Sequence, residues 1–109
     1  MNLNEYRILW ILVFFDLPTE TAKDRKIYAD FRTRLLKDGF TMFQYSIYTR
    51  HCASRENAEV HLKRVKFMLP EKGHIVILTI TDKQFGMMEI YRGCERMPVK
   101  TGYQQLELF

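Results

Sequence analysis

The sequence predicts an α+β domain, because strongly apolar, strand-like runs alternate with two segments that have the apolar spacing of a helix. Residues 8–15 and 75–80 are apolar on both faces of a strand, whereas residues 21–38 and 54–69 carry apolar side chains at helical intervals. The chain has 109 residues, which is enough for one domain, and 47% of them are hydrophobic, which is enough for a packed core.

The first strand is predicted over Tyr6–Phe15, a run rich in β-branched and aromatic residues, and residues 16–18 end it. Its alternate positions form two apolar faces, one with Ile8, Trp10, Leu12 and Phe14 and the other with Leu9, Ile11, Val13 and Phe15. A strand without a polar face is expected at the centre of a sheet that is covered on both sides.

A helix is predicted from Thr21 to about Asp38. Thr21 and Asp24 have the spacing of an N-cap residue and its acidic partner, and Gly39 suits the position just past the last turn. The buried stripe of this helix has an apolar residue at every fourth position, with Tyr28 beside it: Ile27, Phe31 and Leu35.

Residues 40–50 are again rich in strand-forming side chains. The segment is long for one strand, so it forms either one bulged strand or two short ones. Ser54 is expected to cap a second helix that runs to about Leu69, with Pro70 and Gly73 closing it. The core stripe of this second helix comprises Ala58, Leu62, Val65 and Leu69.

The remaining elements are shorter. His74–Thr81 is predicted as a second strand that is apolar on both faces. Asp82 is expected to cap a single helical turn through Phe85, and Met88–Arg92 to form a short strand. Gln104–Phe109 alternates weakly and is a candidate edge strand.

This order of elements is most simply built as a ferredoxin-like β-α-β-β-α-β sheet with two helices on one face. Residues 1–93 form this domain, and residues 94–109 form a C-terminal tail of the same domain, which contains the edge strand. Two helices cover only one face, yet two strands are apolar on both. The simplest way to bury the face without helices is a homodimer in which this face of one copy packs against the same face of the other. The alternative is a monomer in which residues 97–109 fold back over that face.

Composition disfavours several classes of protein. The longest apolar run, Ile8–Phe15, is too short to span a bilayer, and the N-terminus has no basic, cleavable leader pattern. Cys52 and Cys94 are far apart and the histidines are scattered, so neither a disulfide framework nor a zinc site is expected. We therefore expect a cytoplasmic, zinc-free protein with no membrane partner. The net charge of +4 favours polyanionic partners.

Asp16 is the only strong candidate for a metal-binding residue. It directly follows the first strand and suits a turn before Pro18, which would explain it without any chemistry. If the two-fold axis of a homodimer passes nearby, however, two copies of Asp16 meet, and paired carboxylates suit a hard divalent ion. Such an ion polarises a phosphodiester and lowers the pKa of a bound water.

Basic side chains follow one stripe of the first helix, with Asp30 between them: Lys23, Lys26, Arg34 and Lys37. Arg25 and Arg32 flank the apolar face on its other side. This pattern is typical either of a solvated helix face or of a surface that contacts the phosphates of DNA or RNA. Several aromatic residues are instead interpreted as core packing: Phe14, Phe31, Phe43 and Tyr45. No phosphate-binding glycine loop and no Ser/Cys–His nucleophile pattern is present.

The combination of three motifs resembles the CRISPR-associated protein 2 family. These are an apolar strand that ends in Phe15–Pro18, a basic helix closed by Gly39, and the segment Gln44–Tyr48. Thr81–Phe85 is similar as well, and the resemblance covers about residues 6–93. The Asp-Leu-Pro-Thr motif and the terminal Phe109 look most like members that accompany a single-protein RNA-guided effector nuclease.

The resemblance implies a ferredoxin-like homodimer in which the two copies of Asp16 meet at the dimer cleft and hold Mg²⁺ or Mn²⁺. It implies a metal-dependent endonuclease that acts on RNA or DNA. It also implies a scaffold for spacer acquisition, which binds the double-stranded protospacer DNA between two dimers of the CRISPR-associated protein 1 integrase. The C-terminal strand is expected to join the sheet of the partner subunit or the integrase through Leu106, Leu108 and Phe109.

One residue departs from the family pattern. Met42 stands where many nuclease-active relatives have an arginine, and the loss of a cation near the scissile phosphate counts against catalytic turnover but not against the scaffold role. Two other functions stay open. One is a stand-alone metal-dependent endoribonuclease, similar to a toxin that cleaves mRNA. The other is a small-molecule-binding regulatory domain, which predicts no affinity for duplex DNA.

Overall fold

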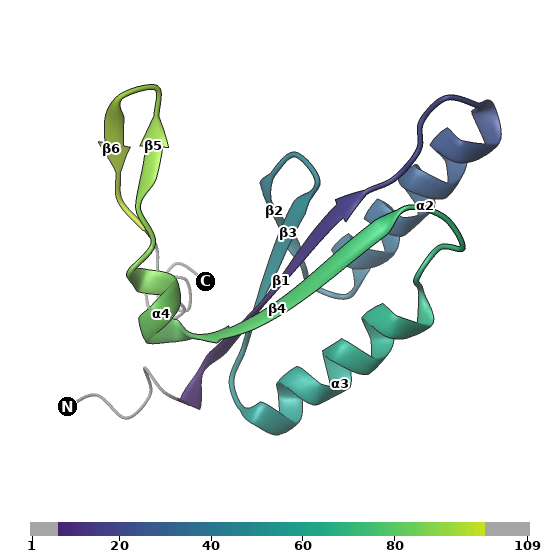
Figure 1. Cartoon of the computed structure of the whole chain (residues 1–109). Helices are drawn as coiled ribbons and strands as arrows, with labels where there is room; N and C mark the ends of the chain where they lie inside the picture. Colours follow the sequence, from purple (N-terminus) through teal and green to yellow (C-terminus); the bar gives the residue numbers. More distant parts are fainter. Residues whose placement is uncertain (1–6, 100–109) are drawn as a thin grey trace.

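The computed structural model describes residues 7–99, in which four strands form one antiparallel sheet in the order β2-β3-β1-β4 (Figure 1). These strands are β1 (Leu9–Asp16), β2 (Thr41–Gln44), β3 (Ile47–Cys52) and β4 (His74–Thr81). β1 pairs with both β3 and β4, so it is the central strand that its two apolar faces predict. With one helix after β1 and another after β3, this order confirms the ferredoxin-like fold.

Two helices pack on one face of the sheet: α2 (Ala22–Lys37) and α3 (Arg55–Phe67). The hydroxyl of Thr21 accepts a hydrogen bond from the N–H of Asp24, whose carboxylate accepts one from the N–H of Thr21, so the predicted cap is a reciprocal capping box. Ser54 caps α3 by accepting a hydrogen bond from the N–H of Asn57, and Gly39 follows α2 with a φ of 90°. No helix in residues 7–99 is long and apolar enough to cross a membrane.

The main core lies between this face and the two helices. β1 contributes its odd-numbered side chains, which confirms one of its two predicted apolar faces. The buried residues of this core are Leu9, Ile11, Val13, Phe15, Leu17, Phe31, Leu35, Phe40, Tyr48, Cys52, Ala58 and Val65. Ile27 and Leu69, which were expected in the buried stripes, lie at its margin and are exposed.

The opposite face of the sheet carries a second, smaller core at one end. Trp10 and Leu12 pack there against Phe85 of α4 (Asp82–Gly86), and the rings of Trp10 and Phe85 are stacked with their centroids 3.7 Å apart. Val99, the last described residue, also packs against this cluster. The second apolar face of β1 is therefore partly covered by the chain that follows β4.

The helical turn α4 is capped by Thr81 and not by Asp82, so this detail of the prediction is wrong. The side chain of Thr81 accepts a hydrogen bond from the N–H of Gln84, and the Gln84 side chain accepts one from the N–H of Thr81. The buried carboxylate of Asp82 instead accepts a hydrogen bond of 2.7 Å from the indole N–H of Trp10. Asp82 thus ties α4 to the central strand.

Toward the start of β4 this face has no cover among the described residues. Val76 is 60% exposed and Leu78 is 45% exposed, and Val76 is paired with Phe14 on β1. We call these three side chains the open-face patch. Large apolar side chains that share an exposed sheet face are typical of an interaction surface.

Residues 40–50 contain two strands, β2 and β3, joined by a tight turn in which Ser46 has a φ of 64°. The pairing of β2 with β3 shifts register between Met42 and Gln44, so a bulge is present as well. Tyr45 lies at the turn and is 77% exposed, so its interpretation as a core residue is wrong. The alternation of aromatic and polar residues in the sequence continues through this turn. Strand pairing is interrupted there, so the alternation does not indicate burial at Tyr45.

A second hairpin, β5 (Ile90–Arg92) and β6 (Glu95–Met97), stands away from the four-stranded sheet (Figure 1). β6 was not predicted, because three residues are too few to show an alternating pattern. Gly93 and the exposed Cys94 form its turn, and Gly93 has a φ of 62°. The edge strand predicted over residues 104–109 lies outside the described residues.

A polar cluster joins the end of α2 to α3 and β3. The carboxylate of Asp38 is hydrogen-bonded to Nδ1 of His61 at 2.8 Å and to Nη1 of Arg64 at 2.9 Å. The backbone carbonyl of Asp38 accepts a further hydrogen bond of 2.8 Å from Nε of Arg50. The side chains of His61 and Asp38 are nearly buried, and the hydrogen bond between them gives each polar group a partner where water cannot reach it.

Candidate functional site

Asp16 is the last residue of β1, and its exposed side chain belongs to the face of the sheet opposite the helices. The alternation along β1 places Asp16 with Trp10, Leu12 and Phe14. On the neighbouring strand it is paired with His74, which is also exposed. The candidate metal-binding carboxylate therefore stands at one end of the open-face patch.

Gly73 holds the loop before β4 tightly against the end of β1. It has a φ of 94°, and a Cβ at this position would lie 2.8 Å from the carbonyl oxygen of Asp16 and 2.6 Å from Cδ2 of Leu17. Glycine is thus needed here both for its backbone conformation and for space. The sequence indicated Gly73 only as the end of a helix, whereas in the structure it fixes the backbone at Asp16.

One chain supplies few metal ligands at this position. Within residues 7–99, no group of three His, Cys, Asp or Glu side chains could hold an ion. Asp16 and His74 are the neighbouring candidate donors, and an exposed carboxylate that leaves room for water suits Mg²⁺ or Mn²⁺. The donor set fits such an ion only if a second molecule adds ligands to it.

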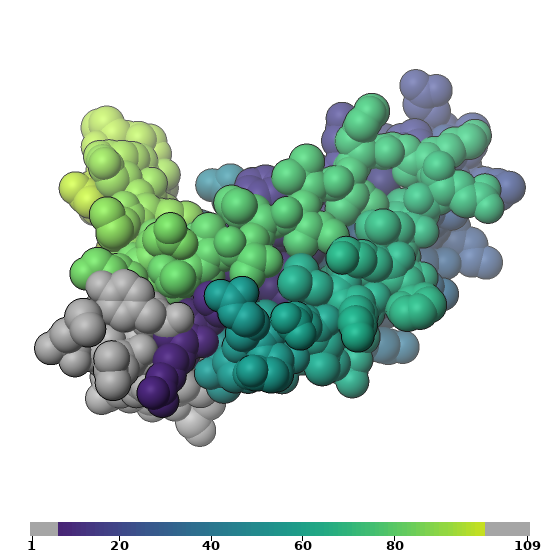
Figure 2. Space-filling model, turned by 60° about the horizontal axis from the view of Figure 1, so that its bottom comes forward, coloured from purple at the N-terminus to yellow at the C-terminus, as the bar shows by residue number. Residues whose placement is uncertain are grey.

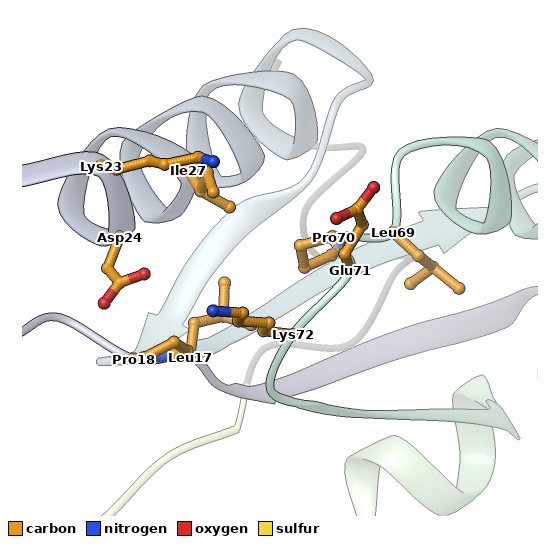
Figure 3. Close-up of a pocket in the computed structure, with 9 residues that line it drawn as sticks. All are labelled: Leu17, Pro18, Lys23, Asp24, Ile27, Leu69, Pro70, Glu71 and Lys72. Carbon is orange, nitrogen blue, oxygen red and sulfur yellow. The ribbon is translucent and has the colours of Figure 1, made fainter. Parts of the chain in front are cut away.

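A pocket of about 420 Å³ lies next to this end of β1, between the start of α2 and the loop from α3 to β4 (Figure 3). Leu17, Ile27 and Leu69 contribute apolar surface to it. Its charged lining residues are Lys23, Asp24, Glu71 and Lys72. Because both signs of charge are equally represented, the pocket has no electrostatic preference for an anion.

The predicted basic stripe of α2 faces α3. Lys23 lines the pocket described above, and Arg34 and Lys37 line a second hollow with the end of α3. Lys26 is exposed, and no ion pair to it is formed within the described residues. The structure therefore keeps these four cations accessible on the helical side of the molecule.

Arg25 and Arg32 lie on the other flank, where both stabilise the fold. Nη1 of Arg25 donates hydrogen bonds of 3.1 Å to the carbonyls of Thr19 and Glu20. Nε of Arg32 donates one of 2.6 Å to the hydroxyl of Tyr48 and so links α2 to β3. These two residues are weaker candidates for phosphate contact, because the fold already uses their guanidinium groups.

Met42 lies on the edge strand β2 and is paired with Tyr48, which is paired in turn with Val13 on the central strand. Two strand spacings and three residues separate Met42 from Asp16, which corresponds to roughly 14 Å. An arginine at position 42 would therefore be distant from Asp16 of its own chain.

His51 lies on the same sheet face as Trp10, with the two ring centroids 5.6 Å apart. Partial burial lowers the pKa of His51, and the positive charge of Arg50 lowers it further, whereas Asp82 acts in the opposite direction. Burial also raises the pKa of the Cys52 thiol. Neither group lies beside Asp16, so we assign both to the fold and not to the candidate site.

Sequence reasoning missed two exposed residues, His74 beside Asp16 and Phe67 at the end of α3. The strand pairing that brings His74 to Asp16 is not visible in either segment alone. Phe67 is not part of the predicted core stripe with Ala58 and Val65, so its position on the helix was the signal that could have shown its exposure. Leu106, Leu108 and Phe109, predicted as an adding strand, lie outside the described residues.

Comparison with known proteins gives a consistent result. The family described as CRISPR associated protein Cas2 matches residues 9–88. A protein of Flavobacterium psychrophilum named CRISPR-associated endoribonuclease Cas2 is 64% identical over 108 residues, which cover 99% of this chain and 94% of that protein. Proteins with the same name from Parvibaculum lavamentivorans and Paracidovorax avenae are 55% and 37% identical, over 93% and 98% of this chain and 100% and 99% of their own length.

Proposed function

Because the chain belongs to the Cas2 family of CRISPR-associated proteins, we propose that it is the small scaffold subunit of spacer acquisition. Two copies pair, and the dimer supports the duplex DNA of an incoming protospacer between dimers of the CRISPR-associated protein 1 integrase in the cytoplasm. The observation that carries this proposal is that Asp16 and the open-face patch share one face of the sheet.

The open-face patch supports pairing of two copies. Helices α2 and α3 occupy the other face and α4 covers only one end of this face, so within residues 7–99 Val76 and Leu78 stay 60% and 45% exposed. Full burial of a Val or Leu side chain contributes about 1.5–3 kcal/mol. In a two-fold contact the same patch meets itself, and the residues at its end then approach their own copies. Asp16 is such a residue.

Pairing adds the second carboxylate that one chain lacks. Asp16 from each copy would hold Mg²⁺ or Mn²⁺, with His74 beside it in each chain. The bound ion would supply polarisation of a phosphodiester and a more acidic water. The exposure of Asp16 supports this assignment, since a substrate phosphate and water can both reach it.

Phosphate contact is assigned to the accessible cations of α2: Lys23, Lys26, Arg34 and Lys37. Such contacts fix the position of a duplex without reading its sequence, which is the property a scaffold for varied protospacers needs. Arg25 and Arg32 would contribute charge from the opposite flank. The C-terminal residues Leu106, Leu108 and Phe109 would add a strand to the partner subunit or to the integrase.

A second function is cleavage of RNA. The relatives named above are called endoribonucleases, and the exposed Asp16 is the residue of this chain that would hold the metal ion for such a reaction. Met42 supplies no cation and lies roughly 14 Å from Asp16 of its own chain, so the carboxylate would act without a neighbouring positive charge at that position, which favours slow turnover. RNA cleavage is therefore secondary to the scaffold role in this proposal.

Reconstitution with the integrase tests the scaffold role. The purified chain, the integrase and a labelled DNA duplex are combined, and expansion of a CRISPR array is measured by amplification across its leader end. We expect a complex that contains two copies of this chain, and integration that depends on it. Binding of the duplex should weaken steeply as salt rises, because counterions are released from DNA. Integration at the same rate without this chain would contradict the proposal.

A further inference from the structure

Phe67 is the most exposed of the large hydrophobic side chains in the described residues. It is the last residue of α3, and 91% of its side chain is accessible. The outer surface of α3 lies open in Figure 2, which brings this helix toward the viewer. Among residues 7–99, no aromatic ring packs against Phe67. Most of its surface is thus available to a ligand.

Cations surround this ring. Phe67 lines a shallow hollow of about 460 Å³ with Arg34 and Lys37 of α2 and Arg64 of α3. Lys63 lies one helical turn before Phe67, on the same side of α3. Three cationic side chains from two helices therefore line the hollow beside one exposed aromatic side chain, and Lys63 lies one turn away on α3.

The acidic residue in the hollow does not offset these cations. Asp38 is nearly buried, and its carboxylate is already hydrogen-bonded to His61 and Arg64. Only one nitrogen of the Arg64 guanidinium makes that contact, and the side chain of Arg64 is 59% accessible. The surface near Phe67 thus presents net positive charge to solvent.

Helix geometry explains part of this pattern but not all of it. Basic residues in the last turn of a helix complement its dipole, which accounts for Arg34, Lys37 and Arg64. The dipole does not account for Phe67. A single exposed phenylalanine is ordinary on a protein surface, so what sets this one apart is the group of cations that share its hollow.

We propose that Phe67 is a stacking platform for an unpaired nucleotide of a single-stranded nucleic acid, whose phosphates are held by Arg34, Lys37, Lys63 and Arg64. An aromatic side chain in a basic groove is the combination that binds single strands without sequence preference. The inference rests on the proposed nucleic-acid role and extends it to the single-stranded flank of a bound duplex.

The chemistry of the hollow favours an unpaired base over the alternatives. Bases inside a duplex are already stacked on each other, so a lone ring gains contact only with a base that is free on one side. A protein partner would be expected to find an apolar surface around its anchor. The hollow beside Phe67 contains Met68 as well as Arg34, Lys37 and Arg64, and three cations without an exposed acidic partner suit a polyanion.

The test compares probes and variants of the full-length chain by fluorescence anisotropy. The probes are a blunt duplex, the same duplex with a single-stranded overhang, and that overhang with abasic positions. Phe67→Leu keeps an apolar side chain without a ring, Phe67→Tyr keeps the ring, and Val60→Ala is a control at another exposed apolar position of α3. Because both positions are on the surface, thermal unfolding of all three variants should be unchanged.

We expect Phe67→Leu to lose roughly five- to a hundredfold in affinity for the intact overhang. Its affinity for the blunt duplex and for the abasic overhang should match the wild type, and Phe67→Tyr and Val60→Ala should bind normally. A 5-iodouracil placed in the overhang should crosslink to the peptide that contains Phe67 on illumination.

Equal affinity of Phe67→Leu and the wild type for the intact overhang would overturn the inference while duplex binding, and with it the proposed function, still stands. If Phe67→Leu instead loses binding of the integrase with no change in nucleic-acid affinity, the ring is a protein contact and the inference is wrong. If the wild-type chain binds none of the probes at low salt, the proposed nucleic-acid role fails first, and the inference fails with it.

Discussion

Gly73 packs against the carbonyl oxygen of Asp16 so closely that a methyl group at position 73 would lie 2.8 Å from that oxygen. The contact joins the loop before β4 to the end of β1, where the candidate metal-binding carboxylate is located. The position of Asp16 therefore depends on a residue that has no functional group of its own.

Gly73→Ala should destabilise the fold and displace Asp16. A φ of 94° alone costs about 1–2 kcal/mol for a residue with a side chain, and the backbone contact adds to this cost. Gly93→Ala is the matched control, because Gly93 also has a positive φ but no atom within 4 Å of its added Cβ. Denaturant unfolding should show the larger loss for Gly73→Ala. Equal losses would mean that close packing at Asp16 is unimportant.

Leu78→Glu should convert a dimer to a monomer, because it places a charge in the open-face patch. Val60→Glu is the matched control, since Val60 is also 45% exposed but lies on α3, away from that face. Light scattering after gel filtration measures the mass of each species. A wild-type chain that runs as a monomer at high concentration would contradict the proposed pairing.

Asp16→Asn should abolish metal-dependent cleavage of RNA or DNA and spare integration, because the scaffold role does not need the carboxylate. The affinity of this variant for Mn²⁺, measured by electron paramagnetic resonance, should also decrease. Glu71→Gln is a control that removes a nearby exposed carboxylate. Loss of array expansion in Asp16→Asn, with complex assembly intact, would show that the carboxylate serves integration itself.

Asp38→Ala should cost about 1–3 kcal/mol of stability, because it leaves the buried His61 without its hydrogen-bond partner. Asp30→Ala on the exposed side of α2 should change stability by less than about 0.5 kcal/mol. Chemical denaturation at neutral pH compares the two. Equal effects would mean that the link between α2 and α3 contributes little.

Stability should decrease as pH falls below about 6.5, with His51 as one source. Burial lowers the pKa of His51 in the folded protein. As the pH falls, His51 is therefore protonated in the unfolded chain at a higher pH than in the folded protein, and this protonation stabilises the unfolded state. The loss begins near the pKa of an unfolded histidine and ends once the folded form is also protonated. His51→Gln should reduce this slope, whereas His74→Gln, at an exposed position, is the control. Identical slopes in His51→Gln and wild type would contradict the assignment.

Much of the fold follows from local patterns. The two apolar faces of β1, the cap at Thr21 and the glycine at 39 each depend on residues close together in sequence, and the structure has all three. The cap at Thr81 also had a local signal, because Thr81 and Gln84 have the spacing of a capping box. The hydrogen bond between Asp82 and the indole of Trp10 did not, because these residues are 72 positions apart.

The surroundings of the candidate site depend on tertiary contacts and were largely unpredictable. Asp16 itself stood out because it ends an apolar strand, but His74 joins it through strand pairing and Gly73 through a close backbone contact. The exposure of Phe67 is different, since this residue is off the predicted core stripe of its helix, but the cations that share its hollow are brought there by tertiary packing. The proposed pairing of two chains has a signal in the sequence, because the first strand is apolar on both faces and two helices cover only one of them.

The two cysteines differ in a way that has a practical use. Cys52 is fully buried and burial raises the pKa of its thiol, so it reacts slowly with maleimides. Cys94 is exposed in the turn of the β5–β6 hairpin. The chain therefore has a single reactive site for a fluorophore or spin label, on the hairpin that stands away from the sheet. In the proposed homodimer, the distance between the two labelled copies of Cys94 could be measured without any mutation.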